Sequence, residues 1–319
     1  MSDKKSTVLD VRKVSKDFSL AGGKKLSAVS DISFTISEGE CFAVIGESGC
    51  GKSTLAKLIT RVEDVSSGEI IFRGEDITKR NKNQLKSVRR YMQMIFQSPI
   101  SVVSPRMTIG SFLLEPYINY RLADKAKAKE EIARMLEDVR LSPDCLKKYP
   151  HQLSGGELQR ICIARAFSLK PELLICDEIT SALDVSVQQS VMQLFNRMRT
   201  DTGTSCLFIC HDLALVKNYS DRVAVMYLGQ AVEIMKSEEL GTRAVHPYTR
   251  GLLRSMLFIS SQRDKGMEPI KGEPQSPIDV PPCCRFCTRC PYADERCFRE
   301  TPPLREVEAG HWAACFKDS

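Results

Sequence analysis

The sequence lacks long hydrophobic segments, and none of its apolar runs approaches the roughly 18 residues that a membrane-spanning helix needs. It opens on the polar residues MSDKK, so we expect neither a signal peptide nor a transmembrane span. Any role at a membrane would then require a partner that spans it. With 42% hydrophobic and 27% charged residues, the composition is that of a soluble globular protein. A length of 319 residues suits two domains, or one large domain with an appendage.

The sequence also lacks a strong excess of one charge, because its formal net charge is only +6. The one local basic run, residues 79–90, has six lysines and arginines and no acidic residue. No aromatic residue is interleaved with these charges, as would be expected of a surface that stacks on nucleic-acid bases. We therefore predict a solvated face here and no nucleic-acid partner.

The strongest motif is a glycine-rich loop between a buried strand and a helix. Residues 41–45 form a short apolar run typical of a buried strand, and residues 54–59 have helical periodicity. The pattern G-x-x-x-x-G-K-S/T between them cradles phosphates with its backbone N–H groups, whereas a glycine-rich turn without a ligand is the alternative. Lys52 would reach the β- and γ-phosphates, and the Ser53 hydroxyl would bind Mg²⁺. The predicted nucleotide-binding residues of this loop are Gly46, Glu47, Ser48, Gly49, Cys50, Gly51, Lys52, Ser53 and Thr54.

Two further strands end in residues suited to phosphoryl transfer. The apolar segments 173–177 and 205–210 predict strands covered on both faces, as in a parallel sheet between helices. After the first, Asp177 can hold Mg²⁺ through water and Glu178 can polarise the attacking water, although an acidic pair here could equally cap a helix. After the second, His211 could donate to a γ-phosphate, although a lone histidine is more often structural.

Other segments predict antiparallel strands and a second anion site. Residues 8–14 favour a first strand, strictly alternating apolar residues favour another over 31–38, and residues 223–235 favour a hairpin. Ser154, Gly155 and Gly156 open a helix that reaches residue 169, so a hydroxyl and bare N–H groups meet at a helix N-terminus. Two γ-phosphate sites in one chain make sense if two chains share two nucleotides.

With these motifs the chain resembles the ATPase subunit of an ABC transporter over nearly its whole length. The resemblance implies an α/β fold with a RecA-like P-loop NTPase core, an antiparallel β part and an inserted helical subdomain at about residues 86–160. It also implies a nucleotide-binding domain over residues 1–235 and a small cysteine-rich C-terminal domain within an extension over residues 236–319.

The same resemblance assigns roles to single residues. It implies that Phe18 stacks on adenine and that Gln97, which ends a predicted strand over 91–97, contacts Mg²⁺ and water. His211 would be the switch histidine, and Gln97, Glu178 and His211 would be the catalytic residues. Residues 153–157 would be the signature, which closes on ATP held by another chain in a head-to-tail dimer, and residues 181–184 the D-loop.

A narrower resemblance is to the ATPases of oligopeptide, dipeptide and nickel importers. It rests on the segments HPYTR at 246–250, SPRMT at 104–108 and PPCCRFCTRCPYA at 281–293. It implies an ATP-hydrolysing subunit for import of peptides or related small solutes, metal chelates included, at the cytoplasmic face of the membrane. The implied partners are a second ATPase (this chain being the F-type of a D/F pair), two permease subunits and an extracytoplasmic solute-binding protein. A soluble ABC ATPase of repair, translation or a lyase complex is the alternative.

Six of the thirteen cysteines lie in the last forty residues, which favours a metal over disulfides. In related proteins four such cysteines hold a 4Fe–4S cluster, and the matching residues are Cys284, Cys290, Cys297 and Cys315. Cys287 creates a C-x2-C-x2-C-P run similar to that of ferredoxins, so it is an alternative ligand. Zinc also suits four thiolates. In either case we expect a structural role for the metal.

Overall fold

The computed structural model describes residues 6–181, 183–257, 270 and 272–317. These residues form two compact units. The first unit is built from Arg80–Leu207, with Ser37–Gly39 and Ser6. The second is built from Thr7–Ile36, Glu40–Lys79 and the described residues from Phe208 onward. The second unit therefore contains both the predicted phosphate loop and the cysteine-rich tail.

The second unit begins with the predicted antiparallel sheet, in the order β2-β1-β4-β5. Its strands are β1 (Thr7–Ser19), β2 (Lys25–Ser37), β4 (Ser67–Phe72) and β5 (Glu75–Asp76), with the turn η1 (Ala21–Gly23). Both β1 and β2 are longer than predicted. Lys13 and Asp31 have positive φ values of 46° and 53° within these strands, and such irregularities interrupt the regular two-residue alternation of side chains along a strand.

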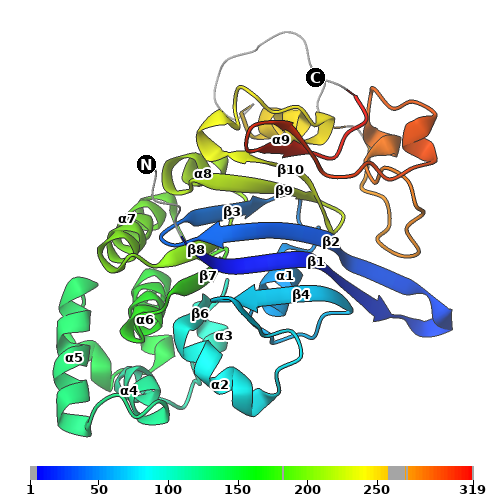
Figure 1. Cartoon of the computed structure of the whole chain (residues 1–319). Coiled ribbons are helices and arrows are strands. Elements are labelled where there is room, and N and C mark those ends of the chain that lie inside the picture. Colours follow the sequence, from blue (N-terminus) through cyan, green and yellow to red (C-terminus); the bar gives the residue numbers. More distant parts are fainter. Residues whose placement is uncertain (1–5, 182, 258–269, 271, 318–319) are drawn as a thin grey trace. The chain divides into compact units, whose positions relative to one another are not determined.

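The second unit also contains the strand that leads into the phosphate loop. This strand, β3 (Cys41–Ile45), is fully buried and pairs in parallel with β9 (Arg222–Tyr227), placing Val44 opposite Ala224. The predicted hairpin is confirmed, because β9 pairs antiparallel with β10 (Gln230–Lys236). The C-terminal strands, red in Figure 1, continue from β10: β12 (His311–Ala313) pairs with it and β11 (Arg305–Glu308) pairs with β12.

Short helices complete the second unit. They are α1 (Lys52–Ile59), α8 (Leu213–Tyr219), η4 (Ser237–Glu239), α9 (Pro247–Leu257), η5 (Cys287–Arg289) and η6 (Arg296–Phe298). The strand β8 (Ser205–Ile209) passes from the first unit into the second at Leu207.

The first unit is mainly helical, as predicted for much of this region. Its strands β6 (Met92–Ile95) and β7 (Leu173–Asp177) pair in parallel, with Met94 opposite Ile175. The strand predicted over 91–97 is therefore shorter, and Gln97 follows it. The helices are α2 (Lys82–Tyr91), α3 (Pro99–Val102), α4 (Ile109–Asn119), α5 (Lys125–Asp138), η2 (Pro143–Lys147), η3 (Pro150–Gln152), α6 (Gly155–Ser168) and α7 (Val185–Thr202).

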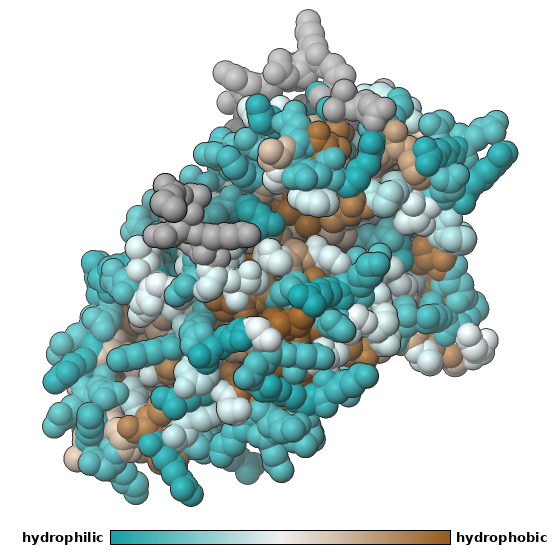
Figure 2. Space-filling model, in the orientation of Figure 1, coloured by the Kyte–Doolittle hydropathy of each residue, from teal (hydrophilic) through white to brown (hydrophobic). Residues whose placement is uncertain are grey.

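Hydrophilic side chains cover much of the face shown in Figure 2, with hydrophobic residues visible between them. In the described part of the chain, we find no helix that combines the length and the apolarity needed to cross a bilayer.

Candidate nucleotide-binding site

The phosphate loop is shaped by close approaches of neighbouring backbone. Gly46 and Gly51 have φ values of 153° and 103°. A Cβ atom at Gly46 would lie 2.2 Å from the carbonyl oxygen of Met226, and one at Gly51 would lie 2.2 Å from that of Ala28. Both contacts are far shorter than any allowed, so only glycine fits at these two positions.

Lys52 is buried inside this loop. Its Nζ donates hydrogen bonds of 2.9 Å to the carbonyl oxygens of both Gly46 and Glu47. It also lies 3.8 Å from the Cys50 Sγ, whose pKa is raised by burial against the opposing effect of the Lys52 charge. Helix α1 starts at Lys52 with Gly51 as its N-cap, so no side chain caps its first N–H groups. The ammonium and these N–H groups form a positive cradle suited to phosphate.

Two more predicted site residues belong to the same unit. His211 is exposed and directly follows Cys210, whose N–H donates a 3.2 Å hydrogen bond to the carbonyl oxygen of Val44 in β3. His211 therefore lies at the sheet edge from which the phosphate loop leaves β3. Phe18 is half-buried within β1, and the Lys16 Nζ lies 4.9 Å from the centre of its ring.

The other predicted catalytic residues belong to the first unit. The side-chain amide of Gln97 donates a 2.7 Å hydrogen bond to the carboxylate of Glu178. Asp177 ends β7 and is buried. Glu178 has a positive φ of 50°, and its carbonyl oxygen accepts hydrogen bonds from both the backbone N–H and the hydroxyl of Ser181. A non-glycine residue in this strained conformation is a common feature of active sites.

The predicted second anion site is the N-terminus of α6. Ser154 is its N-cap: its Oγ accepts a 3.3 Å hydrogen bond from the N–H of Glu157. The Glu157 carboxylate in turn accepts 2.8 Å hydrogen bonds from the Ser154 N–H and hydroxyl, which lower the pKa of this acid. A Cβ at Gly156 would lie 2.5 Å from a methyl group of Val187 in α7, so glycine also permits close helix packing here.

The predicted site residues thus fall into two sets, one on each unit. Phe18, the phosphate loop and His211 lie on the second unit, and Gln97, Asp177, Glu178 and the Ser154 segment lie on the first. Of the predicted D-loop, residue 182 lies outside the described residues.

Sequence reasoning missed contacts between the tail and the phosphate loop. The Glu47 N–H donates a 2.9 Å hydrogen bond to the Tyr248 hydroxyl, and the Glu47 carboxylate forms an ion pair with Arg289. The sequence feature that could have predicted them is Glu47, an acidic residue within a loop that must bind a triphosphate. Its negative charge would have to be compensated by a nearby lysine or arginine.

The tail cysteines form two groups. Cys283 and Cys287 are buried, whereas the four cysteines matched by the family pattern are half-buried. Burial is the main cause that raises the pKa of Cys284 to about 12, and the charges of the Cys297, Cys287 and Cys290 thiolates also contribute. Burial likewise is the main cause that raises the pKa values of Cys290 and Cys297, and the charge of the Cys315 thiolate contributes at both. In the described residues, however, no three His, Cys, Asp or Glu side chains are placed to hold a metal ion.

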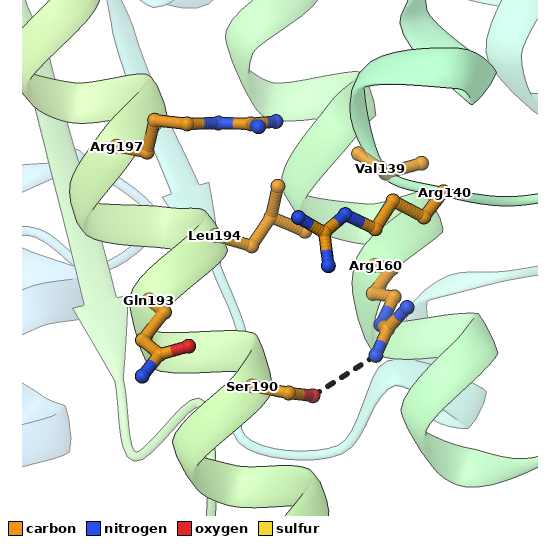
Figure 3. Close-up of a pocket in the computed structure, with 7 residues that line it drawn as sticks. All are labelled: Val139, Arg140, Arg160, Ser190, Gln193, Leu194 and Arg197. Atoms are coloured by element: carbon orange, nitrogen blue, oxygen red, sulfur yellow. Dashed lines mark hydrogen bonds between the residues drawn. The ribbon is translucent and has the colours of Figure 1, made fainter.

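A small pocket in the first unit has a basic lining (Figure 3). Its volume is about 140 Å³, and Arg160 at its edge donates a 2.9 Å hydrogen bond to the Ser190 hydroxyl. Because no predicted site residue lines it, we assign it no part in the ATP chemistry. The lining residues are Val139, Arg140, Arg160, Ser190, Gln193, Leu194 and Arg197.

Comparison with known proteins matches two family models to the chain. The model described as "ABC transporter" matches residues 29–181, and that described as "Oligopeptide/dipeptide transporter, C-terminal region" matches residues 232–297. The oligopeptide transport ATP-binding protein OppF of Haemophilus influenzae is 41% identical, over 99% of both chains. A protein of Sinorhizobium fredii named as a probable peptide ABC transporter ATP-binding protein is 42% identical, over 99% of this chain and 90% of that protein.

Solved structures support the same relationship. The ATP-binding cassette MJ0796, seen as a dimer bound to ADP and Pi, is 25% identical with a TM-score of 0.66, over 72% of this chain and 98% of that one. The chain cbiO1 of Clostridium perfringens, 23% identical with a TM-score of 0.65, covers 80% of this chain and 96% of its own, and shares the fold. The RecA-like P-loop fold expected from the sequence is confirmed. The chain therefore belongs to the ABC transporter ATP-binding proteins, a family of transport-coupled ATPases, and its C-terminal part to the oligopeptide/dipeptide transporter branch.

Proposed function

We propose that this chain is the ATP-hydrolysing subunit of a membrane importer of peptides or related small solutes. The observation that carries the proposal is the match of residues 232–297 to the oligopeptide/dipeptide transporter C-terminal region, together with relatives named for peptide transport that align over 99% of the chain. These names also disfavour the alternative of a soluble ABC ATPase outside transport.

Within this function the phosphate loop would hold the nucleotide. Its N–H groups and Lys52 would bind the phosphates, while Ser53, Gln97 and Asp177 would serve Mg²⁺ directly or through water. The remaining roles are those expected from the sequence: Phe18 against adenine, Glu178 on the attacking water and His211 on the γ-phosphate. The buried Lys52 ammonium and the Gln97–Glu178 hydrogen bond support these assignments.

We propose that ATP is bound between two different ATPase chains arranged head to tail. The capped α6 N-terminus at Ser154 would close on ATP held by the partner's phosphate loop. This chain would be the F-type member of a D/F pair, joined to two permease subunits and supplied by an extracytoplasmic solute-binding protein. It would therefore lie at the cytoplasmic face of the membrane.

For the tail we propose a 4Fe–4S cluster on Cys284, Cys290, Cys297 and Cys315. These four cysteines match the family pattern and are half-buried, whereas Cys287, the alternative ligand, is buried. Zinc, which also suits four thiolates, is the alternative metal. Either metal would act as a structural staple for a segment with few large apolar residues.

The test is reconstitution of the complete transporter in proteoliposomes from this chain, the proposed second ATPase and the proposed permease subunits. We expect ATP-dependent uptake of radiolabelled peptides in the presence of the solute-binding protein, and its loss with Lys52→Ala. Uptake independent of ATP, or a transporter whose ATP hydrolysis responds neither to peptides nor to related small solutes such as metal chelates, would contradict the proposal.

A further inference from the structure

The phosphate loop of this chain contains an acidic residue, Glu47, directly after Gly46. A carboxylate beside a bound triphosphate would repel it, and such repulsion is stronger near a protein surface than in bulk water because the effective dielectric constant is lower. The Glu47 side chain is only 27% exposed, so water screens its charge incompletely. The loop can hold a nucleotide tightly only if this charge is compensated.

Arg289, from the cysteine-rich tail, supplies the compensation. Its Nη1 and Nη2 donate hydrogen bonds of 2.9 and 3.1 Å to the two carboxylate oxygens of Glu47. This bidentate geometry is the strongest that an arginine and a carboxylate form. The Arg289 side chain is 7% exposed and also donates a 3.2 Å hydrogen bond to the Tyr227 hydroxyl. An arginine guanidinium is charged at neutral pH, so this contact is an ion pair.

The surroundings of this ion pair are closely packed. Three aromatic rings lie against one another beside it, with centroid distances of 4.6 Å for Tyr227–Tyr248, 5.3 Å for Tyr227–Phe286 and 5.5 Å for Tyr248–Phe286. All three rings are at most 2% exposed. Tyr248 fixes the backbone of the same acidic residue, because its hydroxyl accepts the Glu47 N–H at 2.9 Å.

A second connection runs through the turn between β9 and β10. The guanidinium of Arg285 donates to the carbonyl oxygen of Leu228, and the next residue, Gly229, donates its N–H to the carbonyl oxygen of Cys50 at 2.8 Å. The tail thus contacts the phosphate loop directly at Glu47, and it reaches Cys50 through the turn between β9 and β10. Ion pairs between exposed side chains contribute little, but this one is bidentate and its guanidinium is buried.

We propose that Arg289 is a positioning residue for ATP binding: it neutralises the Glu47 carboxylate and holds it against the tail, so that the phosphate loop presents a net positive cradle to the triphosphate. The inference rests on the proposed nucleotide site at Lys52 and extends it to a residue outside the nucleotide-binding motifs. It makes the C-terminal extension an electrostatic part of the nucleotide site, in addition to any role in holding a cluster.

A double-mutant cycle on the full chain tests this coupling, with the Kd of Mg-ATP measured by titration calorimetry. Arg289→Ala should raise the Kd about tenfold, because one uncompensated charge then faces the phosphates. Arg289→Lys, which keeps the charge but loses the bidentate geometry, should raise it less. Glu47→Gln by itself can change the affinity for Mg-ATP in either direction. In the Glu47→Gln background, however, adding Arg289→Ala should change the Kd less than about twofold. The Arg289→Ala effect should also shrink at high salt, since it is electrostatic.

Arg299→Ala is the matched control, because Arg299 lies in the same tail and its side chain is 76% exposed in an ion pair with Glu295. It should leave the Kd of Mg-ATP unchanged. An equal loss from Arg289→Ala in the wild-type and Glu47→Gln backgrounds would indicate general damage to the tail and overturn the inference, as would no loss in either. Failure of the nucleotide site itself is distinguishable, because Lys52→Ala would then bind Mg-ATP as the wild type does.

Discussion

Gln97 and Glu178, separated by 81 residues in the sequence, are joined by a 2.7 Å hydrogen bond between the amide of one and the carboxylate of the other. Each follows one of two parallel strands, β6 and β7, that pair with each other. Because the carboxyl ends of parallel strands meet at one edge of a sheet, the pairing of Met94 with Ile175 brings these side chains together. An amide that orients the carboxylate can help it to align an attacking water.

Glu178→Gln should retain Mg-ATP affinity while turnover falls about 100-fold or more, because an amide cannot act as a base toward water. Gln97→Ala should lower turnover less, since it removes only the partner that orients the carboxylate. Phosphate release by the assembled transporter measures both effects. Glu172→Gln, the same change at the opposite end of the β7 segment, is the control and should turn over ATP normally. A Glu178→Gln transporter that hydrolyses ATP at the wild-type rate would refute the assignment.

Ser154→Arg should inactivate the ATP site whose phosphate loop belongs to the other chain of the dimer. The substitution removes the α6 N-cap, which contributes about 1 kcal/mol, and places a bulky side chain at the proposed contact with the γ-phosphate. Transporters that carry Ser154→Arg here and an intact partner should therefore lose nucleotide trapping at the partner's loop. Photocrosslinking of 8-azido-ATP to each chain separates the two sites. Loss confined to this chain's own loop would contradict the head-to-tail arrangement.

Much of the fold could be predicted because its strands carry simple patterns. The continuously apolar β3, β7 and β8 are buried along their whole length, as expected for strands of a covered parallel sheet. The lengths of β1 and β2 were underestimated, because Lys13 and Asp31 adopt positive φ values and interrupt the regular alternation of side chains along these strands. Such backbone irregularities depend on contacts with neighbouring strands, so no local sequence pattern predicts them.

The nucleotide-binding motifs could also be predicted, because each is a short continuous segment whose residue types and spacing follow from binding phosphate or Mg²⁺. The Glu47–Arg289 ion pair could not, since its members are 242 residues apart and neither belongs to a repeating pattern. Only the folded tail, with β12 added to β10 and Phe286 packed on Tyr227, brings them together. Long-range ion pairs of this kind depend on tertiary structure rather than on local sequence.

Cys290→Ser should remove the proposed cluster, whereas Cys287→Ser should not. Anaerobically purified wild-type protein should be brown, with iron and acid-labile sulfide near four per chain, because four thiolates suit a 4Fe–4S cluster. Burial, together with the neighbouring Cys283 thiol, raises the pKa of Cys287 to about 11, as expected for a cysteine of the core. Iron analysis and absorbance check the two variants side by side. Colourless protein with one zinc per chain would overturn the cluster, and bleaching by Cys287→Ser alone would overturn the ligand set.

The last prediction concerns His246, a buried histidine that lies between the β10 strand and α9. Its Nδ1 accepts a 3.1 Å hydrogen bond from the Tyr248 N–H, which requires an unprotonated nitrogen. Its own backbone N–H donates to Glu233 at 3.2 Å, and the Glu233 carboxylate also contacts His311 at 2.8 Å. Burial lowers the pKa of His246 to about 4, against the attraction of the Glu233 charge, from an ordinary value of 6.5.

The sign of the pH effect follows from this lowered pKa. As pH falls below about 6.5 the unfolded chain takes up a proton at His246 while the folded chain does not, so stability is lost progressively down to about pH 4. Between pH 7 and pH 5 this one group should lower the free energy of unfolding by about 2 kcal/mol. His246→Asn should be less stable at pH 7 but should lose about 2 kcal/mol less on acidification. Urea unfolding followed by the fluorescence of Trp312, the single tryptophan of the chain, reports on this region because β12 pairs with β10. His151→Asn, at an exposed histidine, should keep the wild-type pH dependence, and an equally steep loss in His246→Asn would show that another group controls it.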